Sequence, residues 1–99
     1  MSIFSEKVYN TVRKIPRGMV LTYRDVARYT GRPRAARAVG NVLNQNRSTD
    51  VPCHRVIRSD GSAGGYVWGN RKKVEILKKE GIKFIGSKID LCSIIYCLQ

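Results

Sequence analysis

The chain has few of the residues from which metal centres and disulfide frameworks are built. It contains one histidine and three cysteines among its 99 residues. Because three is an odd number, the cysteines do not form a paired framework of disulfides. A zinc site usually takes four ligands at a recognisable spacing, which one histidine and cysteines this far apart do not supply. We therefore expect no metal and no cofactor.

Long apolar stretches are also missing. The longest apolar run lies near the C-terminus and is far too short to span a membrane. The N-terminal residues are charged and helix-like, unlike a signal peptide. Together with the unpaired cysteines, these absences predict an intracellular protein that is not bound to a membrane, cytoplasmic in a prokaryote or nuclear in a eukaryote.

Acidic residues are scarce as well. Seven Asp and Glu stand against nineteen Lys and Arg, which gives a formal net charge of +12. A chain of this length forms one domain, and a small domain with this imbalance repels itself unless a polyanion neutralises it. Nucleic acid is the first candidate for that partner and an anionic membrane surface is the second. A basic surface that serves only solubility is a third and weaker interpretation.

The hydrophobic pattern predicts a mainly α-helical fold. A helix is expected over residues 3–15, where apolar residues recur at helical spacing. Thr22 and Asp25 have the spacing of a capping box, which predicts a short helix from there to Thr30 that Gly31 ends. A second helix is expected over residues 34–45, with an inward face made by Ala35, Val39 and Val42.

The second of these helices carries a polar face beside small residues. This face contains Arg34, Arg37, Asn41 and Asn44, and the small residues next to it are Ala36, Ala38 and Gly40. Cations near the positive end of a helix dipole are disfavoured unless an anion binds there. Two short helices joined by a glycine-containing turn, the second one basic, are typical of a helix-turn-helix DNA-binding unit, although two helices that merely pack together would show similar spacing.

Beyond the helix pair the sequence predicts a small β-hairpin wing and a last helix. The stretch VIRSDGSAGG, residues 56–65, is expected to turn at Asp60–Gly61. The last helix is expected to start with Asn70 as its cap and to end at Gly81. Its inward contacts are expected from Val74, Leu77 and Ile82.

The chain divides into one domain and a short tail. Residues 1–87 carry the patterns described so far and are expected to fold as a single winged helix-turn-helix-like, DNA-binding domain. Residues 88–99 are too apolar for a free tail, because apolar side chains stand at Ile89, Leu91, Ile94, Ile95 and Leu98. This tail is expected to pack back on the domain or to contact a partner, and the sequence favours neither.

The stretch VPCHRV, residues 51–56, brings together Cys53, His54 and Arg55. A free cysteine is most often a buried structural residue. A Cys–His hydrolase is a second interpretation, but the chain shows no oxyanion-hole or triad pattern beside the pair. A third is a cysteine nucleophile that acts on a polyanion, which the surrounding positive charge favours.

Five blocks of the sequence, in order and at nearly the right spacing, resemble the O6-alkylguanine-DNA alkyltransferases. They are TYRDVA at 22–27, RAVGNVLNQN at 37–46, PCHRV at 52–56, GGYVWG at 64–69 and ILKKEG at 76–81. The resemblance covers about residues 4–86 and corresponds to the C-terminal catalytic domain alone, without the N-terminal domain that many members carry. It implies a DNA repair protein that moves an alkyl group from the O6 position of guanine irreversibly to its own cysteine, as a single-turnover methyltransferase.

The resemblance assigns four residues to the reaction. Cys53 corresponds to the alkyl acceptor, and His54 to the residue that takes the thiol proton through a water. Glu80 corresponds to the acid that orients this histidine, and Asn46 to the asparagine that braces the turn before the active-site loop. A histidine backed by a carboxylate suits this role, because a thiol with an ordinary pKa of about 8.5 is a poor nucleophile until it loses its proton.

Six further residues are expected to contact DNA or the extruded base: Tyr23, Ala36, Arg37, Gly40, Arg55 and Tyr66. The target oxygen lies within the base stack, so the guanine must rotate out, and Arg37 corresponds to the arginine that fills the gap. Tyr23 and Tyr66 correspond to aromatic residues near the extruded base. Ala36 and Gly40 are small enough for the helix to lie against the minor groove. The expected partner is double-stranded DNA, bound by a monomer through the minor groove and independently of sequence.

Two positions depart from the family pattern. Arg47 stands where proline is common, and Val67 stands where some relatives have a serine that could bond the leaving base. One rival function from another class remains, a non-catalytic helix-turn-helix protein that senses damage or regulates. The alkyltransferase-like proteins, which bind damage without repairing it, replace the cysteine, so the presence of Cys53 favours repair.

Overall fold

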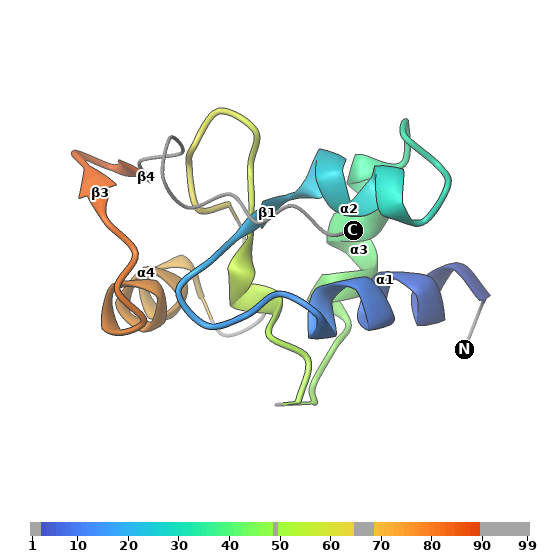
Figure 1. Ribbon diagram of the computed structural model, residues 1–99, viewed down its shortest axis with the longest axis horizontal. Helices are drawn as coiled ribbons and strands as arrows, with labels where there is room; N and C mark the ends of the chain where they lie inside the picture. Colours follow the sequence, from blue (N-terminus) through green and yellow to red (C-terminus); the bar gives the residue numbers. More distant parts are fainter. Residues whose placement is uncertain (1–2, 49, 65–68, 90–99) are drawn as a thin grey trace.

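Four α-helices and two pairs of short strands make up the described part of the chain, which in this computed structural model covers residues 3–48, 50–64 and 69–89. The elements are α1 (Ile3–Arg13), β1 (Leu21–Thr22), α2 (Tyr23–Tyr29), α3 (Ala36–Asn44), the 3-10 helix η1 (Cys53–Arg55), β2 (Val56–Ile57), α4 (Asn70–Lys79), β3 (Phe84–Ile85) and β4 (Lys88–Ile89). Figure 1 shows α1, α2 and α3 at one end, α4 with β3 and β4 at the other, and η1 between them. The predicted mainly α-helical class is confirmed, and no described helix is long and apolar enough to cross a membrane.

The strands β1 and β2 lie between two hydrophobic cores. They pair in parallel, with Leu21 opposite Val56 and Thr22 opposite Ile57. Because successive side chains of a strand point to opposite faces, Leu21 and Val56 belong to the core formed with α1, α2 and α3, whereas Ile57 belongs to the core formed with α4. Since η1 directly precedes β2, Cys53 is held at the edge of the first core.

The capping box predicted before α2 is confirmed. Thr22 Oγ1 accepts a hydrogen bond from the Asp25 amide at 3.0 Å, and Asp25 Oδ2 accepts one from the Thr22 amide at 3.2 Å. These bonds satisfy backbone amides that have no partner within the first turn of the helix. By contrast, α1 ends at Arg13, before the predicted end at Ile15, although Ile15 is buried as expected.

The basic helix α3 begins at Ala36, later than the predicted start at Arg34. Ala35 has φ −97° and ψ 25°, outside regular helical geometry, and offers no side-chain cap. Arg34 therefore lies in the turn before α3 and not on its polar face. The buried residues of the helix are Val39 and Leu43.

The predicted turn at Asp60–Gly61 is confirmed, and a described pair of antiparallel strands lies next to it in space. Gly61 has φ +93° and donates its amide to the Arg58 carbonyl at 3.0 Å. The strand before this turn, β2, pairs with β1, and across the turn the Arg58 amide donates to the Ser62 carbonyl at 2.9 Å. Among the described residues the antiparallel hairpin is β3–β4. It contacts the turn, since the Ile89 amide donates to the Gly61 carbonyl at 2.8 Å.

The predicted end of α4 at Gly81 is confirmed. Gly81 has φ +92° and donates its amide to the Lys78 carbonyl, while the Ile82 amide donates to the Leu77 carbonyl, both at 3.1 Å. This is a Schellman motif, in which glycine is favoured because other residues rarely adopt a positive φ. The motif fixes the position of Glu80, which caps the C-terminal end of α4.

The start and the inward face of α4 differ from the prediction. Gly69 occupies the N-cap position, and Asn70 is the first helical residue and not the cap. The buried residues of the helix are Lys73 and Leu77, whereas Val74 is half-buried. A lysine thus takes the inward position that the sequence pattern gave to a valine.

The described start of the predicted tail is part of the fold. Lys88 and Ile89 form β4, and the Ile89 side chain lies in the core formed with α4. Residues 90–99 of the tail lie outside the described residues. The division of the chain after residue 87 and the role of the tail therefore stay predictions.

Replacing Ile89 with alanine should destabilise the protein, because the side chain is 4% exposed and its removal leaves a cavity. The free energy of unfolding should fall by about 2–4 kcal/mol in urea titrations. The matched control is Ile85→Ala in the same hairpin, where the side chain is 70% exposed and the loss should stay within about 0.5 kcal/mol. Equal losses for the two variants would contradict the packing of β4.

Candidate active site

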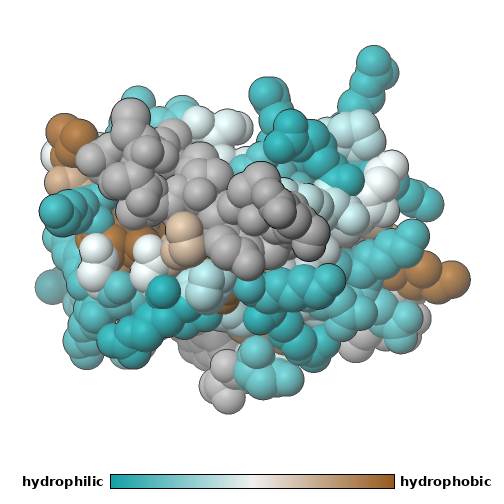
Figure 2. Space-filling view, viewed as in Figure 1, coloured by the Kyte–Doolittle hydropathy of each residue, from teal (hydrophilic) through white to brown (hydrophobic). Residues whose placement is uncertain are grey.

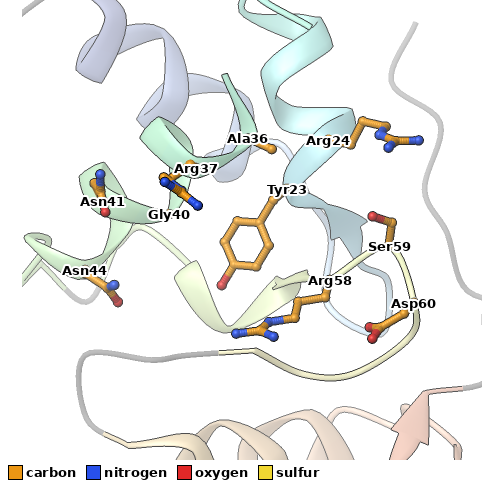
Figure 3. Close-up of a pocket in the computed structure, with 10 residues that line it drawn as sticks. All are labelled: Tyr23, Arg24, Ala36, Arg37, Gly40, Asn41, Asn44, Arg58, Ser59 and Asp60. Carbon is orange, nitrogen blue, oxygen red and sulfur yellow. The ribbon is translucent and has the colours of Figure 1, made fainter. Parts of the chain in front are cut away.

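An open groove of about 610 Å³ lies between α2, α3 and the loop at residues 58–60, and we call it the α3 groove. Its lining consists of Tyr23, Arg24, Ala36, Arg37, Gly40, Asn41, Asn44, Arg58, Ser59 and Asp60. Figure 3 shows the Tyr23 ring in the middle of the groove, between α3 and the loop. Four of the six residues predicted to contact DNA are therefore brought together here: Tyr23, Ala36, Arg37 and Gly40. Tyr66 and Val67 lie outside the described residues.

The α3 groove has the charge that a polyanion requires. Arg24, Arg37 and Arg58 line it, against one acidic residue, Asp60. Hydrophilic side chains also predominate among the coloured residues of the face seen in Figure 2. Cations that converge on an open groove favour binding of an extended anionic chain.

Tyr23 connects the α3 groove to the cysteine. Its ring lines the groove and also packs against the core that contains Cys53. Gly64 lies against the ring, where an added Cβ would stand 3.2 Å from it, and φ at Gly64 is +78°. Glycine alone suits both the close approach and this backbone conformation. Burial raises the pKa of Tyr23, so its hydroxyl is protonated at neutral pH.

Cys53 is the first residue of η1 and is 5% exposed. The backbone bends here, because the Arg55 amide donates to the Pro52 carbonyl at 2.9 Å. The Asn46 side-chain amide donates to the Cys53 sulfur at 3.1 Å and to the Ser48 carbonyl at 3.0 Å. Asn46 thus links the turn after α3 directly to the cysteine.

Glu80 binds His54 and Arg55 at the end of α4. His54 Nε2 lies 2.9 Å from Glu80 Oε2. Arg55 makes a two-point contact with the same carboxylate, from Nε to Oε1 at 3.0 Å and from Nη2 to Oε2 at 2.8 Å. An ionised carboxylate only accepts hydrogen bonds, so the neutral His54 ring donates from Nε2 and keeps its lone pair at Nδ1. A general base needs such a lone pair.

Burial and hydrogen bonding set the protonation states of these groups. Burial raises the pKa of the Cys53 thiol, and the hydrogen bond to its sulfur and a lysine charge only partly offset that rise. Burial lowers the pKa of His54 below its ordinary 6.5, against the pull of Glu80. Burial also raises the pKa of Glu80, but hydrogen bonds from Arg55 and His54 outweigh it and hold that pKa below its ordinary value. At neutral pH the resting site therefore contains a thiol, a neutral imidazole and a carboxylate.

The sequence pattern did not point to Lys73, which the structure adds to the site. Its side chain is fully buried, and Nζ donates to the Tyr23 hydroxyl at 3.3 Å. Burial lowers the pKa of Lys73 to about 7, and the charge of Cys53 opposes that shift. A cation near Cys53 favours the thiolate over the thiol. Helical periodicity could have predicted the burial of Lys73, because this lysine stands four residues before the buried Leu77 and therefore lies on the same face of the helix.

Two arginines have contacts that the sequence did not indicate. Arg55 is expected in the base pocket, but its guanidinium binds Glu80 and, through Nη1, the Ile15 carbonyl at 2.8 Å. These contacts give its guanidinium a role within the protein, and the expected contact of Arg55 with the base stays a prediction. Arg47, in place of the common proline, donates to the Asn44 carbonyl at 2.9 Å and caps the end of α3.

The family model of the 6-O-methylguanine DNA methyltransferase, DNA binding domain, matches residues 3–82. The chain belongs to this family. The matched range contains the α3 groove as well as Cys53, His54 and Glu80. The candidate site therefore lies within the part of the chain that matches the family model.

Two curated proteins that are similar to this chain are longer than it. The chain is 45% identical over 85 residues to a bifunctional methyltransferase/endonuclease of Picrophilus torridus, an alignment that covers 85% of this chain and 28% of that protein. It is 46% identical over 79 residues to a methylated-DNA–protein-cysteine methyltransferase of Shigella flexneri, with 79% and 46% covered. The chain thus spans less than half the length of these two relatives.

A solved structure of similar length has the same fold. Atl1 of S. pombe, in complex with damaged DNA containing O6-carboxymethylguanine, superposes on this chain with a TM-score of 0.85 and 32% identity. The superposition covers 99% of this chain and 98% of Atl1. The predicted winged helix-turn-helix-like DNA-binding fold is confirmed by this match.

Replacing Lys73 with methionine should stabilise the protein in a pH-dependent way. The pKa of Lys73 is about 7 in the folded state, against an ordinary 10.5, so the folded state carries the cost of a buried charge fully below pH 7 and loses it as pH rises toward 10.5. Lys73→Met should raise the free energy of unfolding by on the order of 2 kcal/mol at about pH 6, and this gain should fade toward about pH 10. Urea unfolding at a series of pH values measures it.

The same substitution should make Cys53 less reactive, because it removes a charge that favours the thiolate. The pH at which iodoacetamide labels Cys53 at half its maximal rate should move upward, as followed by peptide mass. Lys72→Met, at an exposed neighbouring position, is the control and should change neither quantity. Unchanged stability together with unchanged labelling of the Lys73 variant would contradict the placement of this lysine.

Proposed function

We propose that this chain is a DNA repair protein that transfers an alkyl group from the O6 position of guanine in DNA to its own Cys53. The observation that carries the proposal is a cysteine held by Asn46 beside a His54–Glu80 pair, next to a basic groove, in a chain of the 6-O-methylguanine DNA methyltransferase family. Relatives at 38–46% identity bear the name methylated-DNA–protein-cysteine methyltransferase. The activity is thus that of a methylated-DNA–protein-cysteine S-methyltransferase, irreversible and stoichiometric.

The proposed transfer forms a sulfur–carbon bond and breaks a carbon–oxygen bond. His54 takes the thiol proton through a water, and Glu80 stabilises the imidazolium that forms. The Cys53 thiolate attacks the alkyl carbon, and the electrons of the carbon–oxygen bond pass to guanine. The leaving guanine gains one ring proton, which balances the proton lost by the thiol. The Tyr23 hydroxyl, which is bonded to Lys73, is positioned to assist this protonation from the α3 groove.

The proposed partner is double-stranded DNA, bound by one chain through the minor groove. Guanine must rotate out of the stack to reach Cys53, and Arg37 on the first turn of α3 is proposed to fill the gap. Ala36 and Gly40 permit a close approach of α3 to the duplex. Contacts from arginine to phosphate carry no sequence information, so binding should be independent of sequence and weaken with salt. The complex of Atl1 with damaged DNA supports this partner.

We propose that one domain, residues 1–87, both binds DNA and carries out the reaction, as the C-terminal catalytic domain does in the family that the sequence resembles. The matching family model is that of the DNA-binding domain, and Cys53, His54 and Glu80 lie within the match. A cysteine that must stay a free thiol supports an intracellular location, where thiols are kept reduced.

A second candidate function is recognition of alkylated DNA without transfer. The observation that favours it is the superposition on almost the whole length of Atl1, a protein solved with damaged DNA. Both functions require the α3 groove, but only transfer requires Cys53, His54 and Glu80. The fate of the alkyl group therefore separates the two.

Mixed with an excess of duplex carrying O6-methylguanine, the protein should react once and stop. A thioether on Cys53 is chemically stable, because a thiolate bonded to an alkyl carbon is a poor leaving group. Product should plateau near one equivalent of protein, and intact mass should rise by one methyl group that maps to Cys53. The matched variant Cys53→Ala should bind the duplex and transfer nothing. Turnover beyond one equivalent, or binding of the duplex without any mass change in the unmodified protein, would contradict the proposal.

Replacing Arg37 with alanine should slow transfer from duplex DNA far more than transfer from a free O6-alkylguanine base. The free base needs no extrusion, whereas extrusion from a duplex costs a few kcal/mol that the arginine helps to offset. We expect a loss of about tenfold or more on duplex and little change on the free base. Arg13→Ala, an exposed position on α1 outside the groove, is the control. Equal losses on both substrates would rule out the extrusion role.

A further inference from the structure

The Arg55 guanidinium joins three parts of the molecule that are far apart in the sequence. It contacts both oxygens of Glu80 at the end of α4, and its Nη1 donates to the Ile15 carbonyl after α1 at 2.8 Å. The Arg55 and Glu80 side chains are only 16% and 8% exposed. A two-point contact between a guanidinium and a carboxylate fixes both the place and the plane of the carboxylate.

Glu80 needs such a partner because of where it lies. The C-terminal end of a helix carries partial negative charge and disfavours an acid. Glu80 caps α4 at that end, and the backbone around Gly18 approaches it closely, since an added Cβ on Gly18 would stand 3.3 Å from the Glu80 carbonyl. Without a cation, this carboxylate would be both destabilised and free to turn away from the imidazole.

Arg55 also acts on His54 through the carboxylate that they share. Charged groups that act on the imidazole are Glu80 at the C-cap of α4, Arg55 on η1 and Lys73 on α4. Glu80 raises the pKa of His54, whereas Arg55 and Lys73 lower it. A carboxylate already neutralised by a guanidinium attracts a second proton-bearing group less strongly.

We propose that Arg55 is a positioning residue for the transfer, which holds the Glu80 carboxylate against His54 and keeps the imidazole neutral and ready to take the thiol proton. This inference rests on the proposed function for its role in the reaction. Its physical content, the control of His54 by Arg55 through Glu80, holds whether or not transfer occurs.

The experiment uses the fact that His54 is the one histidine of the chain. An NMR titration of its ring signals in the full-length protein therefore reports this residue without ambiguity. The variants are Arg55→Met, which removes the charge, and Arg55→Lys, which keeps the charge but loses the two-point contact. The matched control is Arg71→Met. This substitution removes an arginine from an exposed ion pair with Glu75, and both residues of the pair lie on α4.

Arg55→Met should raise the midpoint of the His54 titration by about one pH unit, whereas Arg55→Lys and Arg71→Met should leave it near that of the unmodified protein. If Arg55→Met does not fold, Arg55→Gln, which also removes the charge, carries the same expectation. A midpoint that stays in place in the charge-removing variant would overturn the proposal.

The reaction itself gives the second readout, with a free O6-alkylguanine base as substrate so that DNA binding plays no part. Arg55→Met should lose several-fold more rate at about pH 6 than at about pH 8.5, because its histidine is protonated over a wider range. Arg55→Lys should lose rate by a similar factor at both pH values, since only the orientation of Glu80 is relaxed. Identical pH profiles for Arg55→Met and the unmodified protein would reject the positioning role. Absence of transfer in the unmodified protein would instead reject the proposed function, and the titration would still decide the inference.

Discussion

The burial of the Cys53 thiol is the constraint on which the rest of the site depends. A cysteine that is only 5% exposed is protected from incidental reactions, but burial opposes ionisation of its thiol. Three neighbouring residues favour loss of the thiol proton, each in a different way. Asn46 donates a hydrogen bond to the sulfur, Lys73 supplies a nearby positive charge, and His54 is present as a neutral base. At rest the thiol therefore stays protonated in a site that also contains a neutral base.

Two residues of the site, Lys73 and Glu80, break local rules of folding, and this marks the site independently of any motif. A lysine in a fully buried helical position costs stability, and a glutamate at the C-terminal end of a helix opposes the helix dipole. Each violation is partly offset nearby, for Lys73 by Tyr23 and for Glu80 by Arg55. Local rules are expected to fail mainly at functional or strained positions, so two failures around one cysteine point to chemistry rather than to packing alone.

The sequence predicts those features whose cause is local. The capping box at Thr22 and the glycine end of α4 at Gly81 follow from residues a few positions apart, and both are confirmed. The pairing of β2 with β1 could not be predicted, because it joins residues more than thirty positions apart. The choice of Glu80 as the partner of Arg55 has the same origin, since only the assembled fold brings η1 to the end of α4.

The residues proposed for the reaction and for contact with DNA were assigned by resemblance rather than by physics. Cys53, His54 and Asn46 lie within eight positions of one another, and the fold keeps them together; Tyr23, Ala36, Arg37 and Gly40 meet along one groove. Helical periodicity could have predicted that Lys73 is buried. The sequence nevertheless favours a solvent-exposed cluster there, because three basic residues follow one another from Arg71. Tyr66 lies outside the described residues, so its place beside the groove stays a prediction.

A single-use reaction explains how so small a fold can be sufficient for the proposed function. An enzyme with turnover must release its product and restore its nucleophile, which calls for additional groups and motions around the reacting atom. Under the proposed function the product stays on Cys53, so the site needs only to generate one thiolate and to admit one base. Two small cores joined by β1 and β2 provide this, because one positions the sulfur and the other positions the helix end that carries Glu80. Under the same proposal, DNA binding must give access to guanine in any sequence. A groove lined by arginines and small residues suits this requirement, because contacts to phosphate do not read the sequence.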